Sequence, residues 1–443
     1  MTHLIFSNNN FSDLRTALLQ SDLETSAIAL ANVGRGSERT RLLVREIHRV
    51  PDDEYAERTP LSAVLKPTFL APLAKQARLQ KQALVFIHTH PGSGSVPSFS
   101  VTDDRGEQLL KSFLDKREAN APHAALVLNR DYCRGRLLAT HDPVQVLQVG
   151  PSLTILFDTD NPSADSNKFD RQVRAFGKHG QAILRKLRVG IVGLGGTGSV
   201  IAQQLAHLGV ENYLLIDPDV VEESNLNRLV GASIPDVGAS KVEVASRHIK
   251  QISPSANVKT NGGSVLDVST ARLLIDTDFL FYCTDSHGSR AVLNQLAYQY
   301  LVPAIDVGVT IATEKGKVSH VAGRAQMLSP GLSCLTCANF LNADAVRRDL
   351  MTSFQRQADP YFIGNGEPEP AVISLNSTVS SMAITTFLAA VTGIPIKTRY
   401  QIYNAITGNV RAVASSPDPV CIVCSKRGAL ARGDEWPLPA RPG

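Results

Sequence analysis

The stretch that most constrains the fold is LRVGIVGLGGTGS, residues 187–199. Its apolar start predicts a buried strand, and Gly193, Gly195 and Gly198 follow in G-x-G-x-x-G spacing before a helical pattern. Glycines at this spacing let the backbone turn tightly and approach a phosphate at the N-terminus of the helix. From about residue 169 the chain alternates strands and helices, which predicts βαβ units in a parallel sheet.

The glycine turn alone fits two classes of nucleotide enzyme. Asp217 ends the next apolar run, YLLIDPD, where a nicotinamide-dependent dehydrogenase keeps the acid that binds the ribose. The polar residues that follow favour ATP and Mg²⁺, because carboxylates hold the ribose and the metal while Arg and Lys neutralise phosphate charge. In chain order these residues are Asp219, Asn225, Arg228, Lys241 and Asp285.

This set resembles the ubiquitin-activating-type (ThiF/MoeB-like) adenylyltransferases over residues 169–425. The resemblance implies a Rossmann-like, doubly wound α/β domain that uses ATP and Mg²⁺ to adenylate the C-terminal carboxylate of a β-grasp, ubiquitin-like protein. Arg171 in FDRQVR matches the arginine finger that such enzymes usually lend across a homodimer, and Asp285 matches the magnesium ligand. Leu229 departs from a glutamine common after the family arginine, here Arg228. The implied nucleotide-binding positions are Gly193, Gly195, Gly196, Gly198, Asp217, Asp219, Asn225, Arg228, Lys241 and Asp285. The implied catalytic residues of this domain are Arg171, Arg228, Lys241 and Asp285.

Four of the six cysteines form two CxxC pairs, CLTC and CIVC. Such pairs predict a closed, structural zinc site that fixes the C-terminal end of the domain to its body. A chain of 443 residues with so few cysteines is no disulfide scaffold, which favours a reducing cytoplasm. The ligands would be Cys334, Cys337, Cys421 and Cys424.

A second metal site is predicted in FIHTHPGSGSVPSFSVTDDRGEQLL, residues 86–110. His88 and His90 follow a strand pattern at period two, so both imidazoles lie on one face of the strand. Asp103 opens a helical pattern and adds a carboxylate. Two histidines and one carboxylate leave a coordination position open for water, the arrangement of a catalytic zinc site.

These residues resemble the JAMM (MPN+) metalloproteases, in which a glutamate precedes HxH and S-x-x-D. The resemblance implies an α/β, cytidine-deaminase-like domain with zinc on His88, His90 and Asp103. Glu24 would be the general base, with Glu46 as its rival, and Ser100 would hold the oxyanion. Twelve residues separate His90 from Asp103, two more than is common, and Val101 occupies the usual slot. A metal-free binding module therefore remains an alternative.

The segment after CLTC contains no cysteine that could carry a thioester. Three fates of an adenylate remain: direct transfer to a partner such as a conjugating enzyme, attack by a sulfur donor to give a thiocarboxylate, or an oxyester on Thr352 or Ser353. Direct transfer is preferred, because an unactivated hydroxyl is a poor nucleophile. We expect Cys133 and Cys283 to be small buried apolar residues.

The predicted organisation is a JAMM-like domain over 1–150, a linker over 151–168, the adenylyltransferase domain over 169–425 and a flexible tail over 426–443. The net charge of +4 does not indicate a nucleic-acid partner. No secretory signal and no apolar run of membrane-spanning length is apparent, so we expect a cytoplasmic protein.

The sequence thus predicts a bifunctional enzyme of a bacterial ubiquitin-like conjugation system, similar to components of antiviral defence operons. One domain would activate the modifier, and the other would process or remove it. Two alternatives stay open. The JAMM-like domain is inactive and only binds, or the chain activates a sulfur-carrier protein.

Overall fold

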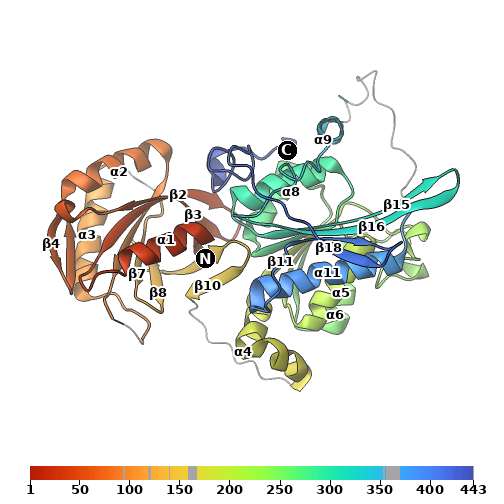
Figure 1. The fold of residues 1–443 in the computed structure, drawn as a ribbon, viewed down its shortest axis with the longest axis horizontal. Helices are drawn as coiled ribbons and strands as arrows, with labels where there is room; N and C mark the ends of the chain where they lie inside the picture. The colour runs from red at the N-terminus through yellow and green to blue at the C-terminus, as the bar shows by residue number, and fades with distance from the viewer. Residues whose placement is uncertain are drawn as a thin grey trace. The chain divides into compact units, whose positions relative to one another are not determined.

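The computed structural model describes residues 1–92, 95–117, 121–138, 140–157, 167–352, 355 and 370–442. The chain divides into two compact units, shown in Figure 1. Unit 1 comprises Met1–Asn161, Gln299–Leu301 and Ala429–Pro437, and unit 2 comprises the remainder. The predicted linker begins too early, because residues 153–157 form a strand that pairs within unit 1. The rest of the linker falls largely outside the described residues.

Unit 1 is built on an eight-stranded mixed sheet of order β1-β3-β2-β6-β7-β8-β9-β10. A further parallel pairing joins β1 to β9, so that the sheet closes on itself. The elements are β1 Thr2–Ser7, α1 Asn8–Leu18, β2 Ser26–Arg35, β3 Thr40–Arg49, β4 Tyr55–Thr59, β5 Ser62–Leu65, α2 Pro67–Gln80, β6 Ala83–Thr89, α3 Val101–Asp115, β7 Ala124–Leu128, β8 Cys133–Leu137, β9 Pro143–Val149 and β10 Leu153–Phe157.

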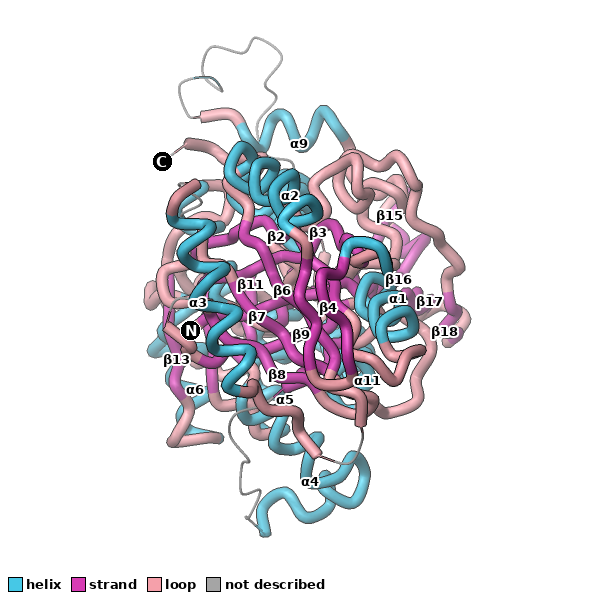
Figure 2. Tube along the Cα trace, turned by 90° about the vertical axis from the view of Figure 1, so that its left-hand side faces the viewer, coloured by secondary structure: helices cyan, strands magenta, loops and turns pink. Residues whose placement is uncertain are grey.

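Helices cover both faces of this sheet. Phe11, Leu14 and Leu18 of α1 pack on one face, whereas α2 and Leu114 of α3 pack on the other. Figure 2 shows α2 and α3 together, with α1 apart from them. Because both faces are covered, β2 and β6 are almost continuously apolar instead of alternating.

The predicted flexible tail is instead packed where residues 429–437 join unit 1. Asn32 donates to the carbonyl of Ala431 and to Glu435, and Gln299 donates to the carbonyl of Gly433. Ala429 and Ala431 are buried. The Pro, Gly and Arg content suggested a loose chain, but these long-range hydrogen bonds order it.

Unit 2 contains an eight-stranded sheet of order β13-β12-β11-β14-β15-β16-β17-β18. The elements are α4 Asp170–Lys186, β11 Arg188–Val192, α5 Gly196–Leu208, β12 Asn212–Ile216, α6 Lys241–Ile252, β13 Asn257–Asn261, α7 Val268–Leu273, β14 Phe279–Tyr282, α8 His287–Gln299, β15 Ala304–Glu314, β16 Lys317–Leu328, α9 Ala343–Leu350, α11 Ile373–Thr392, β17 Tyr400–Asn404 and β18 Asn409–Ala412.

The strands from β13 to β15 are parallel, and those from β15 to β18 are antiparallel. Figure 1 shows α8 on one face of this sheet and α5, α6 and α11 on the other. The predicted α/β class with a Rossmann-like order of strands is confirmed.

One helix corrects the sequence analysis. By length and composition alone, α11 could cross a membrane, although no apolar run of that length was expected. Serines and threonines interrupt its apolar residues, so the sequence shows no continuous apolar run here. More than half of its most apolar stretch is buried in the protein. The helix packs against α5, β15 and β16, as the core helix of a globular unit does.

Candidate active sites

The glycine turn of unit 2 lies where the strand order reverses. From β11 the chain proceeds to β12 on one side, while β14 lies on the other side. Ligands of open α/β sheets bind at such a point, outside the carboxyl ends of the strands. Asp217 follows β12 and Asp285 follows β14, so both acids lie at the same edge as the turn.

The glycines of the turn have different physical roles. Gly193 has a φ of 88°, and a Cβ there would meet the backbone oxygen of Cys283 at 2.5 Å. A Cβ on Gly198 would lie 1.9 Å from the oxygen of Gly193. A Cβ on Gly195 would meet nothing within 4 Å among the described residues. The open space at the N-terminus of α5 is therefore at Gly195.

Asp217 ties this turn to the end of β12. Its carboxylate accepts the backbone N–H of Leu194 at 2.5 Å and that of Asp219 at 2.8 Å. The residue is only 4% exposed. Burial raises the pKa of Asp217, and the two backbone donors partly offset the rise. The carboxylate thus shapes the turn before any nucleotide binds.

The predicted basic residues lie on the segment after β12. Lys241 begins α6, and its ammonium donates to Asp219 at 2.8 Å. Arg228 donates to the carbonyl of Ser224 at 2.6 Å, and its Cδ lies 3.5 Å from the Cβ position of Gly196. Within the described residues, Arg228 has no carboxylate partner. Asn225 is buried and accepts the backbone N–H of Glu222 in a local turn.

Asp285 is exposed just beyond β14. Its carboxylate has no partner among the described residues, while its backbone carbonyl accepts a hydrogen bond from Arg290 at 3.1 Å. An exposed carboxylate beside a glycine turn suits a hydrated Mg²⁺ ion, which prefers oxygen ligands.

Arg171 does not join this group within its own chain. Its neighbour Gln172 donates to the carbonyl of His207 at 3.1 Å, at the C-terminal end of α5. The glycine turn lies at the other end of α5, which is 13 residues long. A helix of that length spans about 20 Å. Arg171 is therefore too far away to contact phosphates in its own turn.

Comparison with known proteins decides between the two nucleotide classes. The sequence profile described as "ThiF family" matches residues 169–423. The chain belongs to the ThiF family. The molybdopterin-synthase adenylyltransferase of Escherichia coli (strain K12) is 29% identical over 261 residues, covering 58% of this chain and 96% of that protein. The SAMP-activating enzyme E1 of Haloferax volcanii is 25% identical over 273 residues, covering 60% and 92%.

Solved structures similar to this ThiF-family chain include E. coli MccB with succinimide. The sequence identity is 17%, the TM-score is 0.47, and the match covers 60% of this chain and 75% of MccB.

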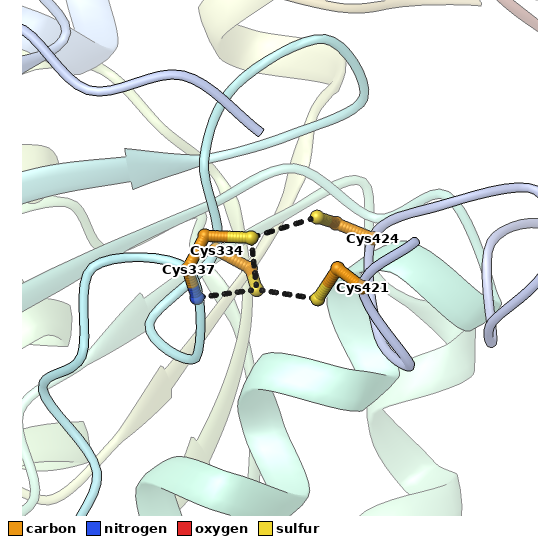
Figure 3. A group of neighbouring side chains, drawn as sticks. All are labelled: Cys334, Cys337, Cys421 and Cys424. Atoms are coloured by element: carbon orange, nitrogen blue, oxygen red, sulfur yellow. Dashed lines mark hydrogen bonds between the residues drawn. The ribbon is translucent and has the colours of Figure 1, made fainter. Parts of the chain in front are cut away.

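The ThiF-family unit brings its four cysteines together, as Figure 3 shows. Cys334 lies 3.6 Å from Cys337 and from Cys421, and Cys337 lies 3.4 Å from Cys424, all between sulfur atoms. Sulfurs on one tetrahedral zinc ion, each about 2.3 Å from it, lie roughly 3.8 Å apart.

The four thiols differ in acidity: burial raises the pKa of Cys421, and the hydrogen bond with Cys334 raises the pKa of Cys424. Hydrogen bonding from Cys424 and from the backbone N–H of Cys337 outweighs burial and lowers the pKa of Cys334 to about 5. The backbone N–H of Val423 points at the sulfur of Cys421 at 3.4 Å. The cluster can bind zinc with all four positions filled by protein.

In unit 1, β6 and α3 bring His88, His90 and Asp103 together. The two Nε2 atoms are 3.2 Å apart. Asp103 lies 3.2 Å from Nε2 of His88 and 3.6 Å from that of His90. Burial raises the pKa of Asp103, but its hydrogen bonds with both histidines outweigh this and hold the pKa well below its ordinary value. These donors converge as metal ligands do.

Of the two candidate glutamates, Glu24 lies at this cluster. Its carboxylate is 3.6 Å from Nε2 of His90, and the residue is 6% exposed. The antiparallel pairing of β2 with β6 places Ser26 opposite His88, which brings Glu24 alongside. Burial raises the pKa of Glu24, and the two histidines lower it in part. Glu46 instead contacts Gln76 and His48.

Ser100 has a structural task that the sequence analysis did not predict. Its hydroxyl accepts the backbone N–H of Asp103 at 3.2 Å, and Asp103 accepts the backbone N–H of Ser100 at 2.5 Å. This capping box begins α3 and fixes the Asp103 carboxylate near the histidines. Val101 is 68% exposed on the first turn of α3. Part of the long loop before it, residues 93 and 94, lies outside the described residues.

Among the described residues, Cys133, Cys283 and Thr352 show no sign of nucleophilic activation. Burial raises the pKa of Cys133 to about 12 and that of Cys283 to about 12. The hydroxyl of Thr352 accepts the backbone N–H of Gln355 at 3.2 Å. Ser353 lies outside the described residues.

Sequence reasoning missed two arginine networks, one half-buried and one buried. In unit 1, Arg136 donates to Asp104 and Glu107 on α3, and its guanidinium lies 3.9 Å from the ring of Phe99. In unit 2, Asp306 pairs with Arg290 and Arg324. A charged residue inside an apolar strand, as in AIDVG, was the available signal for the second network.

Proposed function

We propose that unit 2 adenylates the C-terminal carboxylate of a small β-grasp protein, either a ubiquitin-like modifier or a sulfur carrier. A carboxylate oxygen attacks the α-phosphorus of ATP, the bond to the β-phosphate oxygen breaks, and pyrophosphate leaves. Both relatives reported above are named as activating enzymes or adenylyltransferases, and this chain spans nearly all of their length.

The single observation that carries this proposal is the arrangement at the strand switch. The glycine turn follows β11, between β12 and β14. Lys241 and Arg228 lie on the segment after β12, and Asp285, whose carboxylate has no partner among the described residues, lies after β14. Fixed cations beside a metal-binding carboxylate suit a triphosphate undergoing substitution, because charge on phosphate oxygens must be neutralised. Hydride transfer to a nicotinamide ring develops no charge on phosphate oxygens, so it requires neither the cations nor the metal-binding carboxylate.

A homodimer supports the same reaction. Arg171 is exposed and lies at the far end of α5 from its own glycine turn. A second copy of the chain could present this guanidinium to the phosphates. Mixing an R171A chain with a chain carrying a defective turn would restore activity if the arginine acts in trans, and would not if it acts in its own chain.

Exchange of radiolabelled pyrophosphate into ATP tests adenylation directly. The full-length protein is incubated with ATP, Mg²⁺ and candidate β-grasp proteins ending in Gly-Gly. Exchange that depends on such a protein, and is lost when its C-terminus is amidated, supports the proposal. A protein that binds NADH and catalyses no exchange with any candidate contradicts it.

We further propose that the adenylate passes directly to a partner nucleophile, such as the cysteine of a conjugating enzyme. High thiol pKa values at Cys133 and Cys283 argue against a thioester on either. Intact-mass analysis of the products distinguishes a thioester on the partner from a thiocarboxylate made with a sulfur donor. Both the thioester and the thiocarboxylate route are compatible with a reducing cytoplasm that contains ATP.

A second function is proposed for unit 1: zinc-dependent hydrolysis of a peptide or isopeptide bond at the modifier's C-terminus. Three convergent ligands with a buried carboxylate beside them support it. In this site His88, His90 and Asp103 would hold zinc, which supplies an activated water, and Glu24 would take the water's proton.

Metal analysis separates this function from the alternative of an inactive binding module. About two zinc ions per chain, one of them lost in H88A, support the peptidase. One zinc ion, retained in H88A and lost in C421S, supports the binding module. A chain joining activation to removal of one modifier would suit a conjugation system, including one that acts in defence.

A further inference from the structure

A buried cluster of two arginines and one aspartate lies beside the proposed adenylation site. Asp306 on β15 is fully buried, and Arg290 on α8 and Arg324 on β16 are each 8% exposed. Arg290 donates through Nε to Asp306 at 3.1 Å, and Arg324 donates through Nη2 to the other carboxylate oxygen. Two guanidiniums thus share one carboxylate.

This cluster has unused donors. Arg324 gives Nη1 to Gln326, and its guanidinium carbon lies 3.5 Å from the ring centre of Phe340. Among the described residues, neither Nη2 of Arg290 nor Nε of Arg324 donates a hydrogen bond. Neither nitrogen is among the fully buried polar atoms that lack a partner, so each keeps some access to solvent and to a ligand. The net charge of the cluster, two cations and one anion, leaves one positive charge for a further anion.

The backbone leaves room for such an anion at Gly308. Strand pairing places Gly308 opposite Arg324 and Asp306 opposite Gln326, so these residues share one face. A Cβ on Gly308 would lie 3.3 Å from Nη2 of Arg290 and 4.0 Å from Nη2 of Arg324. Any larger residue would therefore crowd Nη2 of Arg290 and would touch Nη2 of Arg324, which already donates to Asp306.

The cluster is also connected to the proposed magnesium ligand. Arg290 donates through Nη1 to the carbonyl of Asp285 at 3.1 Å. Tyr282, the last residue of β14, pairs with Asp306, so β15 continues beyond β14 alongside the segment that carries Asp285. Gly308 is therefore on the strand next to the nucleotide edge of the sheet.

We propose that Arg290 and Arg324, held by Asp306, bind the C-terminal carboxylate of the incoming protein tail over Gly308. This assignment rests on the proposed adenylation, and it identifies the residues that recognise the substrate's carboxylate. A carboxylate that approaches a triphosphate is repelled by its negative charge. The single net positive charge of the Arg290–Asp306–Arg324 cluster offsets that repulsion. Because Asp306 already takes part of the guanidinium charge, the bound carboxylate keeps its nucleophilic character.

The geometry also suits a flexible tail that ends in glycine. One carboxylate oxygen rests on a guanidinium N–H while the other is free to attack the α-phosphorus, so no proton needs to move. After attack, the bond from the α-phosphorus to the leaving pyrophosphate is broken, and the same N–H remains on the acyl carbonyl oxygen. Arg290 and Arg324 are substrate-positioning residues, and Asp306 positions them.

The test measures binding of a synthetic peptide ending in Gly-Gly, as its free acid and as its C-terminal amide. The full chain is saturated with Mg²⁺ and a non-hydrolysable ATP analogue. We expect wild type to prefer the acid by about tenfold or more, since a charge-assisted hydrogen bond is lost in the amide. In R324Q the preference should fall below about twofold, and R324K should retain part of it.

A second variant distinguishes loss of the carboxylate site from misfolding of the protein. G308A keeps both arginines and their ion pairs with Asp306, but its methyl group lies against Nη2 of Arg290, which has no acceptor among the described residues. It should weaken binding of the acid and leave affinity for the ATP analogue and the thermal midpoint unchanged.

The inference is overturned if wild type shows no preference for the acid, or if G308A and R324Q retain it. It is also overturned if R324Q weakens nucleotide and peptide equally while lowering the thermal midpoint, because that outcome marks a purely structural cluster. An acid preference in a protein that catalyses no pyrophosphate exchange would contradict adenylation and leave the carboxylate site standing.

Discussion

Lys241 and Asp219 contact each other twice. The lysine ammonium lies 2.8 Å from the carboxylate, and the lysine backbone N–H donates to the aspartate carbonyl at 3.0 Å. The Lys241 side chain is 12% exposed, whereas that of Asp219 is 63% exposed. The lysine is thus fixed at the start of α6, while its partner remains accessible to a ligand.

Replacing Lys241 with Ala should lower the rate of pyrophosphate exchange by about 10²-fold or more, because a preorganised cation on developing phosphate charge is lost. K250A provides the control, since Lys250 is exposed at the other end of α6. Equal rates of pyrophosphate exchange in K241A and wild type would show that Lys241 has no role in the reaction.

Two of the glycines in the turn, Gly198 and Gly195, should respond differently to replacement by alanine. G198A places a methyl group against the fixed oxygen of Gly193 and should reduce the free energy of unfolding by about 1–3 kcal/mol. G195A meets only open space, so stability should persist while the apparent Kd for ATP rises by about tenfold or more, equivalent to ~1.4 kcal/mol. Thermal melts and nucleotide titration measure the two effects. Unimpaired ATP binding by G195A would show that the phosphates lie elsewhere.

Cys421→Ser should remove the structural zinc. Three thiolates bind the ion more weakly than four, so we expect the loss of one zinc per chain and a thermal midpoint lower by at least about 5 °C. Cys133→Ser is the control for zinc content, because Cys133 is not one of the four clustered cysteines. An unchanged zinc content in C421S would show that the four sulfurs do not share an ion.

Glu24 and Glu46 offer a matched pair for unit 1. E24Q should retain zinc and lose about 10²–10⁴-fold of any peptidase rate, because the proton acceptor is gone. E46Q should retain both zinc and rate, since Glu46 contacts Gln76 and His48 instead. Cleavage of a fluorogenic modifier fusion provides the measurement. A greater loss in E46Q than in E24Q would reverse the assignment.

Cys133 and Cys283 should resist alkylation in the folded protein. Burial raises each pKa to about 12, so each thiolate forms only as the pH rises towards that value. At pH 8 the thiolate fraction is about 10⁻⁴, compared with about a quarter for an ordinary cysteine. Iodoacetamide mapping by mass spectrometry at pH 8 and pH 10 should show little labelling at either pH, and more in urea. Fast labelling of native Cys283 would reopen the thioester route.

How far the sequence predicted each site depends on the distance between its parts along the chain. The His88–His90 pair follows from the period of one strand, and the glycine turn follows from one strand, loop and helix. By contrast, the sequence could not choose firmly between Glu24 and Glu46, because the choice depends on how β2 pairs with β6. Ser100 was assigned to chemistry, although the same S-x-x-D spacing builds a helix cap.

Sequence by itself determined the local devices of this protein: the phosphate-type turn, the paired metal ligands and the ThiF-family order of strands and helices. Their periods and spacings act over a few residues, so the amino acids alone specify them. Only the tertiary structure decided which distant groups meet. It placed Arg171 at the far end of α5, packed residues 429–437 into unit 1, and joined Arg290, Asp306 and Arg324. These contacts depend on strand order and helix packing, which bring together side chains that no sequence spacing relates.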